Sequence, residues 1–561
     1  MYKLHLSRAS FFLSLLSILL FASSSLAATK PDAHAIASAH PLATNAGHEI
    51  LAAGGNAFDA AIAVTAALAV VEPAGSGLGG GGFFLLHRAQ DQFEVMIDAR
   101  EKAPLAAHKD MYLDKNGDVI KGASWNGPLA AGIPGIPAAL VHLAKKYGKL
   151  PLRLSLGPAI RYARNGFTIS DSYRNKAKWR LKIFQSYPET AAIFLDEGEL
   201  PKVGFLLKQN DLASTLQALT KGKDGFYSGE IAQKLVSGAR TAGGIWTLED
   251  LAQYQIVERE PITFNYKQAR IVSAAPPSSG GVALATMLNI LDDYDLDKID
   301  TASRTHIIVE AMRRAYRDRS VYLGDPDFVN IPVERLINQN YAAGLRASIR
   351  MDQATASETL PGSQLNSTGT DTTHFSIIDT DGNRVAATLS INLPFGAAFA
   401  PPGTGVLLND EMDDFSMKPG VPNAYGLIGN AANAIAPGKR PLSSMSPTFI
   451  ETEDRVAVLG TPGGSRIITM VLHGILEFIE GESVNSWVNK KRFHHQYLPD
   501  VIQHEKDTFD KETMIKINKL GHILQEKLRP YGNMQAILWN KKTGQITAAS
   551  DARGIGKATV K

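Results

Sequence analysis

The chain has 561 residues, a formal net charge of +3 and no cysteine. Without cysteine it has no disulfide, no thiol nucleophile and no cysteine-ligated metal. The small net charge gives no reason to expect nucleic acid or an anionic membrane as a partner. Hydrophobic residues make up 44% of the chain, which is ample for a large core.

The N-terminus has the pattern of a secretory signal. Lys3 and Arg8 precede an apolar run at residues 11–21, which is too short to span a bilayer comfortably. Small residues at 25–27 predict cleavage between Ala27 and Ala28. We therefore expect residues 1–27 to be a signal peptide and the mature protein to be periplasmic or secreted. An uncleaved membrane anchor is the alternative.

The next segments mix buried helices with hairpins. Residues 57–71 are apolar but short and contain Asp59, so they predict a buried helix rather than a membrane span. Residues 83–100 predict a hairpin, and helical patterns dominate 137–240 and 302–322. The glycine run at 79–82 is not a phosphate loop, because no Gly-Lys-Ser/Thr follows it. We interpret this run as close backbone packing at the rim of a site.

A loose stretch at 351–371, rich in Ser, Thr and Gly, ends directly before Thr372. Two strand patterns follow around the turn signal at 381–383. Cleavage before Thr372 would create an N-terminal threonine, which carries a nucleophilic hydroxyl and its own base, the α-amine. By position alone, an ordinary threonine at a strand edge remains the simpler interpretation.

The C-terminal third repeats the hairpin pattern at 448–460 and 534–550, with helical patterns at 466–479 and 511–528. Antiparallel strands and helices in separate blocks indicate a layered α+β fold. No repeat and no linker divides the chain into independent domains.

The order of motifs adds a family resemblance. From Thr372 the chain reads TTHFSIID, then GVLLNDEMDDFS, PLSSMSP and GTPGGSRI; upstream it contains GGNAFDAA, GLGGGGFFL, IDAREKAP and PPSSGG. It resembles the γ-glutamyltranspeptidases (glutathione hydrolases) of the N-terminal-nucleophile hydrolase superfamily over nearly the whole mature chain. The resemblance implies a four-layer αββα sandwich, shared by a large fragment 28–371 and a small catalytic fragment 372–561.

The resemblance also implies the chemistry. The Thr372 hydroxyl attacks the carbonyl of Asp371, and water opens the resulting ester, so the chain cleaves itself. Thr372 then forms a γ-glutamyl-enzyme that passes its acyl group to water or to an amino acid or dipeptide. Gly463 and Gly464 are expected to stabilise the oxyanion. Ser390 stands where many relatives have a threonine that bonds the nucleophile. No cofactor or metal is expected.

The γ-glutamyl group is a zwitterion at its α-carbon, so it needs partners of both charge signs. Arg100 matches the family's carboxylate-binding arginine, and a guanidinium fork suits a carboxylate. The remaining matches are Ser443 and Ser444 beside Arg100, Asp414 for the ammonium with Asn392 and Glu411 as its helpers, and Tyr425 on a lid loop. His374 is not needed as a base, because the α-amine fills that role.

The expected partners are glutathione and other γ-glutamyl compounds, small acceptors, and the two fragments as a heterodimer. A glutaryl-specific cephalosporin acylase of the same family is one alternative, but glutaryl lacks the ammonium that Asp414 would bind. A non-catalytic periplasmic binding protein is another, but the retained Thr372 argues against it. Lys490 and Lys491 replace the family's more usual Ala-Pro, which affects only local surface detail.

Overall fold

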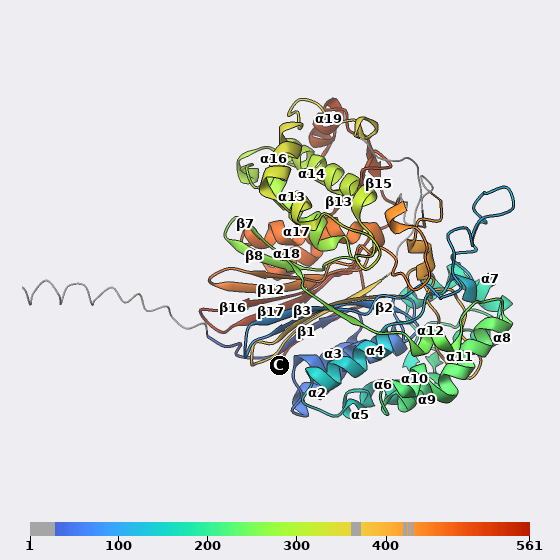
Figure 1. Ribbon diagram of the computed structural model, residues 1–561. Coiled ribbons are helices and arrows are strands. Elements are labelled where there is room, and N and C mark those ends of the chain that lie inside the picture. Colours follow the sequence, from blue (N-terminus) through green and yellow to red (C-terminus); the bar gives the residue numbers. More distant parts are fainter. Residues whose placement is uncertain (1–28, 361–371, 419–422, 425–426, 428–430) are drawn as a thin grey trace, which may run out of the picture.

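Two stacked β-sheets form the centre of the molecule, and helices cover both outer faces (Figure 1). The computed structural model describes residues 29–360, 372–418, 423–424, 427 and 431–561. The predicted signal peptide, Asp371 and Tyr425 lie outside these residues. The four layers confirm the predicted αββα sandwich.

The first sheet has seven strands, and every neighbouring pair is antiparallel. In spatial order they are β18 (Lys557–Val560), β1 (Ala35–Ser38), β9 (Thr373–Ile378), β10 (Arg384–Ser390), β2 (Gly81–Arg88), β3 (Phe93–Asp98) and β6 (Val257–Arg259). Both predicted fragments therefore contribute strands to one sheet, and β1 of the large fragment lies between β18 and β9 of the small fragment.

The second sheet has six strands, again antiparallel throughout. Their spatial order is β17 (Ile546–Ser550), β16 (Gln535–Asn540), β12 (Arg455–Gly460), β11 (Thr448–Glu451), β8 (Ala269–Ser273) and β7 (Ile262–Tyr266). The small sheets contain β4 (Phe167–Thr168), β5 (Leu206–Leu207), β13 (Phe493–His494), β14 (Ile502–His504) and β15 (Leu524–Glu526).

The helices divide between the two outer faces (Figure 1). On the side of the seven-stranded sheet lie α2 (Pro41–Ala52), α3 (Ala57–Val71), α4 (Ile136–Lys146), α5 (Leu152–Ser155), α6 (Gly157–Asn165), α7 (Asp171–Ser186), α8 (Pro188–Phe194), α9 (Asn210–Leu219), α10 (Asp224–Tyr227), α11 (Gly229–Thr241) and α12 (Leu248–Ala252). On the other side lie α13 (Gly280–Leu291), α14 (Thr301–Tyr322), α15 (Val333–Leu336), α16 (Gln339–Ala347), α17 (Ile467–Ile479), α18 (Val484–Asn489) and α19 (Lys511–Lys519).

Helix α3 shows why an entirely apolar segment forms a helix here. Asn56 accepts hydrogen bonds from the backbone amides of Phe58 and Asp59, and Asp59 accepts one from the amide of Asn56, a complete capping box. All of its residues are buried, because α3 lies between other helices and the seven-stranded sheet. The predicted buried helix is confirmed, with the predicted bounds.

The β9–β10 hairpin places Thr372 deep in the fold. Asp379 accepts hydrogen bonds from the amides of Asp381 and Asn383, and Gly382 supplies the positive φ of the turn. Both strands are buried, since one face contacts the α3 layer and the other contacts the six-stranded sheet. Thr372 precedes β9 at the open end of the hairpin, opposite the turn and beside the end of β10.

The predicted helix at 511–528 is wrong in its second half. Helix α19 ends at Lys519, and Gly521 turns the chain with a φ of 94°. The following residues form β15, which pairs in parallel with β14. Gly521, in a left-handed conformation, ends the helix. The helical pattern of the residues after Gly521 was misleading, because these residues pair with β14, which precedes α19 in the chain.

The described start of the stretch 351–371 is held by two acids, the buried Glu310 and the partly exposed Asp500. The amide of Thr355 donates to Glu310 Oε1 over 3.0 Å, and the amide of Ser357 donates to Asp500 Oδ2 over 2.7 Å. Residues 361–371 lie outside the described residues, so the fragment boundary stays a prediction. Within the described residues, no helix is both long and apolar enough to cross a membrane.

Candidate active site

Thr372 lies between two cavities and forms part of the wall of both. The residue is buried, with 4% of its surface exposed. It precedes β9, whose register pairs Thr373 with Leu389 of β10, so Thr372 lies next to Ser390. Thr372 therefore borders ligands bound in either cavity.

The smaller cavity, which we call the polar pocket, has about 20 Å³ of free space and unites nearly all of the predicted site. Its wall contains Thr372, Ser390, Arg100, Asn392, Glu411, Asp414, Ser443, Ser444 and Gly464. Gly463 lies in the wall of the larger cavity instead. The wall of the polar pocket also includes Arg319, which the sequence analysis did not select.

Arg100 is fully buried and forms ion pairs with two acids of the pocket. Its Nη2 lies 2.5 Å from Asp414 Oδ2, its Nη1 contacts Glu411, and its Nε donates to the carbonyl of Pro441 over 3.2 Å. Burial alone would lower the pKa of Arg100, but Glu411, Glu101 and Asp414 raise it above the usual value. The two charge signs predicted for one ligand therefore lie side by side.

The short 3₁₀ turn Glu411–Asp414 contains two adjacent acids, Asp413 and Asp414, that have different partners. Asp413 accepts hydrogen bonds from Ser124 Oγ and Trp125 Nε1, each over 2.8 Å, and so fixes the loop. Asp414 lines the polar pocket. Of the adjacent pair, only the acid that the resemblance indicated is available to a ligand there.

Ser390 and Asn392 shape the floor of the pocket. Ser390 Oγ accepts from the amide of Asn392 over 2.7 Å and also bonds Glu411. Asn392 has a φ of 71° and donates from its side chain to the carbonyl of Asp410 over 2.9 Å. The Ser390 hydroxyl thus organises the pocket, and its predicted bond to Thr372 stays a prediction.

Ser443 and Ser444 are held by a hydrogen-bond chain that starts at Arg319 of α14. Arg319 Nε donates to Ser279 Oγ over 2.9 Å, and Arg319 Nη2 donates to Ser444 Oγ over 3.2 Å. Ser279 Oγ in turn donates to the carbonyl of Ser443 over 2.7 Å. The signal that could have indicated Arg319 is a charged residue one turn after buried Tyr316 on the inner face of a predicted helix.

Gly463 and Gly464 connect β12 to the helical turn that leads into α17. Their φ angles are 146° and 57°, a conformation that favours glycine. Gly463 lines the larger cavity and Gly464 the polar pocket, so each glycine shares a cavity wall with Thr372. Amides at a helix start carry partial positive charge, which suits a developing oxyanion.

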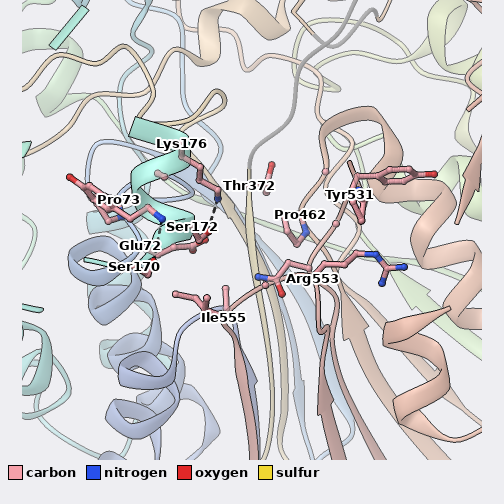
Figure 2. Close-up of a pocket in the computed structure, with 18 of the residues that line it drawn as sticks. Glu72, Pro73, Ser170, Ser172, Lys176, Thr372, Pro462, Tyr531, Arg553 and Ile555 are labelled. Carbon is pink, nitrogen blue, oxygen red and sulfur yellow. Dashed lines mark hydrogen bonds and ion pairs between the residues drawn. The ribbon is translucent and has the colours of Figure 1, made fainter. Parts of the chain in front are cut away.

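The larger cavity also borders Thr372, has about 210 Å³ of free space and is not lined by Glu411 or Asp414. Figure 2 shows one wall from the region of α7 and another from the C-terminal segments, with Thr372 between them. The labelled residues are Glu72, Pro73, Ser170, Ser172 and Lys176 on the first wall and Pro462, Tyr531, Arg553 and Ile555 on the second. Lys176 Nζ lies 3.9 Å from Glu72 Oε1.

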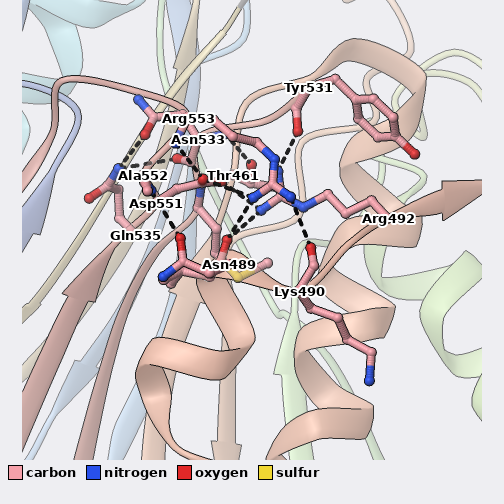
Figure 3. A network of polar contacts seen from close by, with 12 residues as sticks. Thr461, Asn489, Lys490, Arg492, Tyr531, Asn533, Gln535, Asp551, Ala552 and Arg553 are labelled. Carbon is pink, nitrogen blue, oxygen red and sulfur yellow. Dashed lines mark hydrogen bonds and ion pairs between the residues drawn. The ribbon is translucent and has the colours of Figure 1, made fainter. Parts of the chain in front are cut away.

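A buried ion-pair network supports the second wall (Figure 3). Asp551 lies between two arginines: its Oδ2 is 2.6 Å from Arg492 Nη2, and its Oδ1 is 3.0 Å from Arg553 Nη1. Arg553 Nη2 also contacts Glu505 Oε2 over 2.6 Å, and Arg492 donates to the carbonyl of Tyr531. The network holds Arg553 in place beside the cavity.

His374 is a structural residue of the sheet. Its Nδ1 is 2.8 Å from Thr388 Oγ1 and its Nε2 is 3.2 Å from Ser376 Oγ. Complete burial lowers the pKa of His374 to about 3, so the ring is neutral at physiological pH. This arrangement agrees with assigning no base function to it.

The glycine run at 79–82 packs directly behind the pocket. A Cβ atom at Gly80 would lie 2.1 Å from the carbonyl oxygen of Ser390, and one at Gly81 would lie 2.5 Å from Glu101 Oε2. Only glycine allows the backbone to approach this closely, which confirms the predicted close packing.

One group of potential metal ligands occurs in the described part of the chain: His306, Glu310 and His522. His306 Nδ1 is 2.8 Å from His522 Nε2, and its Nε2 is 2.7 Å from the carbonyl of Arg350. Glu310 forms an ion pair with Arg314 over 2.5 Å. These groups serve the protein's own hydrogen bonds, so the cluster is structural.

Comparison with known proteins identifies the family. The family model described as gamma-glutamyltranspeptidase matches residues 43–560. The glutathione hydrolase proenzyme of Pseudomonas sp. (strain A14) is 45% identical over 492 residues, covering 87% of this chain and 85% of that protein. The Escherichia coli (strain K12) glutathione hydrolase proenzyme is 42% identical over 531 residues, covering 93% and 91%.

Solved structures agree. Cephalosporin acylase from Bacillus halodurans is similar with a TM-score of 0.83 and 28% identity, covering 95% of this chain and 96% of that chain. A chain of Helicobacter pylori gamma-glutamyltranspeptidase has a TM-score of 0.57 and 42% identity, covering 58% and 94%. The motifs, the αββα fold and these likenesses agree, and the chain belongs to the γ-glutamyltranspeptidase family.

Proposed function

We propose that this protein is a γ-glutamyltransferase and glutathione hydrolase whose nucleophile is the hydroxyl of Thr372. The observation that carries the proposal is the polar pocket beside that hydroxyl, where Arg100 lies against Glu411 and Asp414. A γ-glutamyl group presents a carboxylate and an ammonium on one carbon atom. A buried site that contains both charge signs matches that zwitterion.

The first reaction is self-cleavage. The Thr372 hydroxyl adds to the carbonyl carbon of Asp371, and the peptide C–N bond breaks as the ester C–O bond forms. The amine of Thr372 takes the proton, and water then hydrolyses the ester. The products are a fragment that ends at Asp371 and a fragment 372–561 whose α-amine acts as the base in catalysis.

The second reaction is acyl transfer. Thr372 Oγ attacks the γ-carbonyl of the donor while its α-amine accepts the hydroxyl proton. The amides of Gly463 and Gly464 stabilise the oxyanion, and the leaving amine takes the proton and departs. Water or an acceptor amine then attacks the γ-glutamyl ester. Since Thr372 borders both cavities, we place the glutamyl group in the polar pocket and the leaving group or acceptor in the larger cavity.

Recognition of the donor requires an exchange of ion pairs. Arg100, Ser443 and Ser444 bind the α-carboxylate, while Asp414, Glu411 and Asn392 bind the ammonium. The pocket has about 20 Å³ of free space, which holds little more than one water. The zwitterion must therefore replace the direct contacts of Arg100 with Asp414 and Glu411 by contacts of its own.

The likeness to a cephalosporin acylase makes glutaryl compounds the second candidate donors. A glutaryl group has the carboxylate but no ammonium. It would separate Arg100 from the partly buried Asp414 and leave that acid without a cation, which is costly. The pocket therefore favours γ-glutamyl donors. With the N-terminal signal pattern, we also propose a periplasmic or secreted enzyme that consists of the two fragments as a heterodimer.

The test combines processing with donor preference. A denaturing gel with N-terminal sequencing should show a small fragment that begins at Thr372. The processed enzyme should hydrolyse γ-glutamyl p-nitroanilide with a kcat/KM far above that for the glutaryl anilide. Hydrolysis of the glutaryl anilide with an equal or higher kcat/KM would refute the proposed glutathione hydrolase activity and favour a glutaryl-specific cephalosporin acylase. A single uncleaved, inactive chain would indicate a binding protein.

A further inference from the structure

Arg319 is a buried cation whose charge is not neutralised by a direct ion pair. It is 5% exposed and lines the polar pocket. Its side-chain partners are two hydroxyls, Ser279 Oγ at 2.9 Å and Ser444 Oγ at 3.2 Å. Among the residues that the structure describes, no carboxylate forms an ion pair with it. A buried guanidinium in this state is costly unless an anion comes near.

The charge balance of the polar pocket depends on this residue. Glu411 and Asp414 together outweigh Arg100, the cation that contacts both of them. Glu101 Oε2 lies 3.4 Å from Arg100 Nη1, but Glu101 is not part of the pocket wall, and burial raises its pKa well above the usual value. With Arg319 the pocket contains two cations and two acids, the balance that suits a zwitterion.

Arg319 also orients the serine pair. A hydroxyl has one proton, so Ser444, whose oxygen accepts from Arg319, keeps its own proton for another acceptor. Ser279 accepts from Arg319 and donates to the carbonyl of Ser443, which anchors the backbone of the pair. Both contacts turn the serine pair toward the binding of an anion in the pocket.

We propose that Arg319 is the second cation of the polar pocket and a specificity-determining residue, which selects donors with an α-carboxylate through Ser444 and through its own charge. The inference deepens the proposed function and rests on it. Arg100 binds the carboxylate as a fork, and Arg319 acts behind the serine pair as a positioning residue. Burial lowers the pKa of Arg319 only to about 10, so it remains a cation at neutral pH.

The experiment separates selectivity from general damage by using three anilides. The γ-glutamyl compound carries both α-groups, the glutaryl compound carries only the carboxylate, and the 4-aminobutyryl compound carries only the amine. Where turnover is slow, the compound is measured as a competitive inhibitor of γ-glutamyl hydrolysis. We expect wild type to bind the 4-aminobutyryl compound, which lacks the α-carboxylate, much more weakly than the γ-glutamyl compound.

In Arg319→Gln, we expect KM for γ-glutamyl and the corresponding constant for glutaryl to rise roughly tenfold to a hundredfold, as for a lost charged hydrogen bond. The constant for the 4-aminobutyryl compound should change little. Arg319→Lys keeps the charge but not both hydrogen bonds, so it should fall between wild type and Arg319→Gln. An equal loss for all three compounds, or no loss, would overturn the proposal.

Arg314→Lys is the matched control, because Arg314 lies on the same helix, is equally buried and pairs with Glu310 outside the pocket. It should leave the ratio among the three compounds unchanged. If Arg319→Gln does not fold, Ser444→Ala and its double mutant with Arg319→Lys replace it. Their effects on the carboxylate preference should be less than additive, since both act through one hydroxyl; full additivity would refute the coupling.

The outcomes also separate this inference from the proposed function. If wild type does not hydrolyse the γ-glutamyl anilide, the proposed function fails. If wild type does so and the Arg319 variants keep its carboxylate preference, only the role of Arg319 fails.

Discussion

Two regions of this protein contain buried charges, and they differ in how those charges are paired. In the network behind the larger cavity, Arg492 and Arg553 share Asp551, and each also donates to backbone carbonyls (Figure 3). In the polar pocket, Arg100 contacts both acids of the wall, Glu411 and Asp414, whereas Arg319 donates only to hydroxyls. In the first region the charged groups pair with one another and with backbone carbonyls of the fold. In the second, the positive and negative charges balance only when the whole pocket is counted.

The difference shows that burial of charge does not by itself indicate a binding site. A buried ion pair resists separation, because each partner left alone pays its full desolvation cost. Where buried acids and arginines pair with one another and with backbone carbonyls, the cost of separating them opposes unfolding and so stabilises the fold. Where two cations and two acids surround free space beside a nucleophile, a zwitterion can take over their contacts, and that region binds ligand.

The largest effect on activity is expected from loss of the Thr372 hydroxyl, which belongs neither to the ion-pair network nor to the charged groups of the polar pocket. Thr372→Ala should remain a single chain and lose hydrolysis by roughly 10⁴-fold or more, because it has no nucleophile. Its midpoint of thermal unfolding should stay near that of the wild-type precursor. Gel analysis and anilide assays measure both effects. Efficient cleavage of this variant would mean that an external protease processes the chain.

The next effect should be on stability and should come from the network. Asp551→Asn leaves Arg492 and Arg553 without the carboxylate that lies between them. We expect the free energy of unfolding to fall by about 3–5 kcal/mol, the usual cost of breaking a buried ion pair. KM for γ-glutamyl anilide should be unchanged in the folded enzyme. Urea denaturation and kinetics test this, and a raised KM with intact stability would contradict the assigned roles.

Arg100→Lys should have the opposite pattern. The lysine retains the charge but not the bidentate fork. The kcat/KM for γ-glutamyl anilide should therefore fall by an amount that corresponds to a loss of about 1.5–3 kcal/mol in transition-state stabilisation. Self-cleavage should proceed as in wild type, because it involves no donor. Asp414→Asn is the companion variant and should narrow the preference for γ-glutamyl over glutaryl. Unchanged donor kinetics would remove Arg100 from the site.

The smallest effect should come from pH. Burial raises the pKa of Glu411 to about 7, so this carboxyl gains a proton as pH falls from 8 to 6. The pocket then has one anion fewer for the donor's ammonium, and KM should rise a few-fold over this range. In Glu411→Gln the dependence of KM on pH should be flatter. An equal dependence in both enzymes would assign the titration to another group, such as the α-amine of Thr372.

Local signals in the sequence were sufficient for much of the fold. The apolar run 57–71 and the β9–β10 turn at Gly382 contain their own caps and turn residues, and both formed as predicted. Helix α19 was predicted too long, because β15 exists only through its pairing with β14, a contact between segments apart in the sequence. Local periodicity contains no information about such a partner.

The sequence by itself determined the family, the order of motifs and nearly all residues of the polar pocket, since short motifs keep reactive side chains at characteristic positions. The resemblance already indicated Asp414 rather than Asp413, and the tertiary structure supplies the physical reason, because hydrogen bonds from Ser124 and Trp125 hold Asp413 elsewhere. Only the tertiary structure decided that Arg319 belongs to the pocket. The physical reason is that desolvation and charge balance depend on which distant segments pack together.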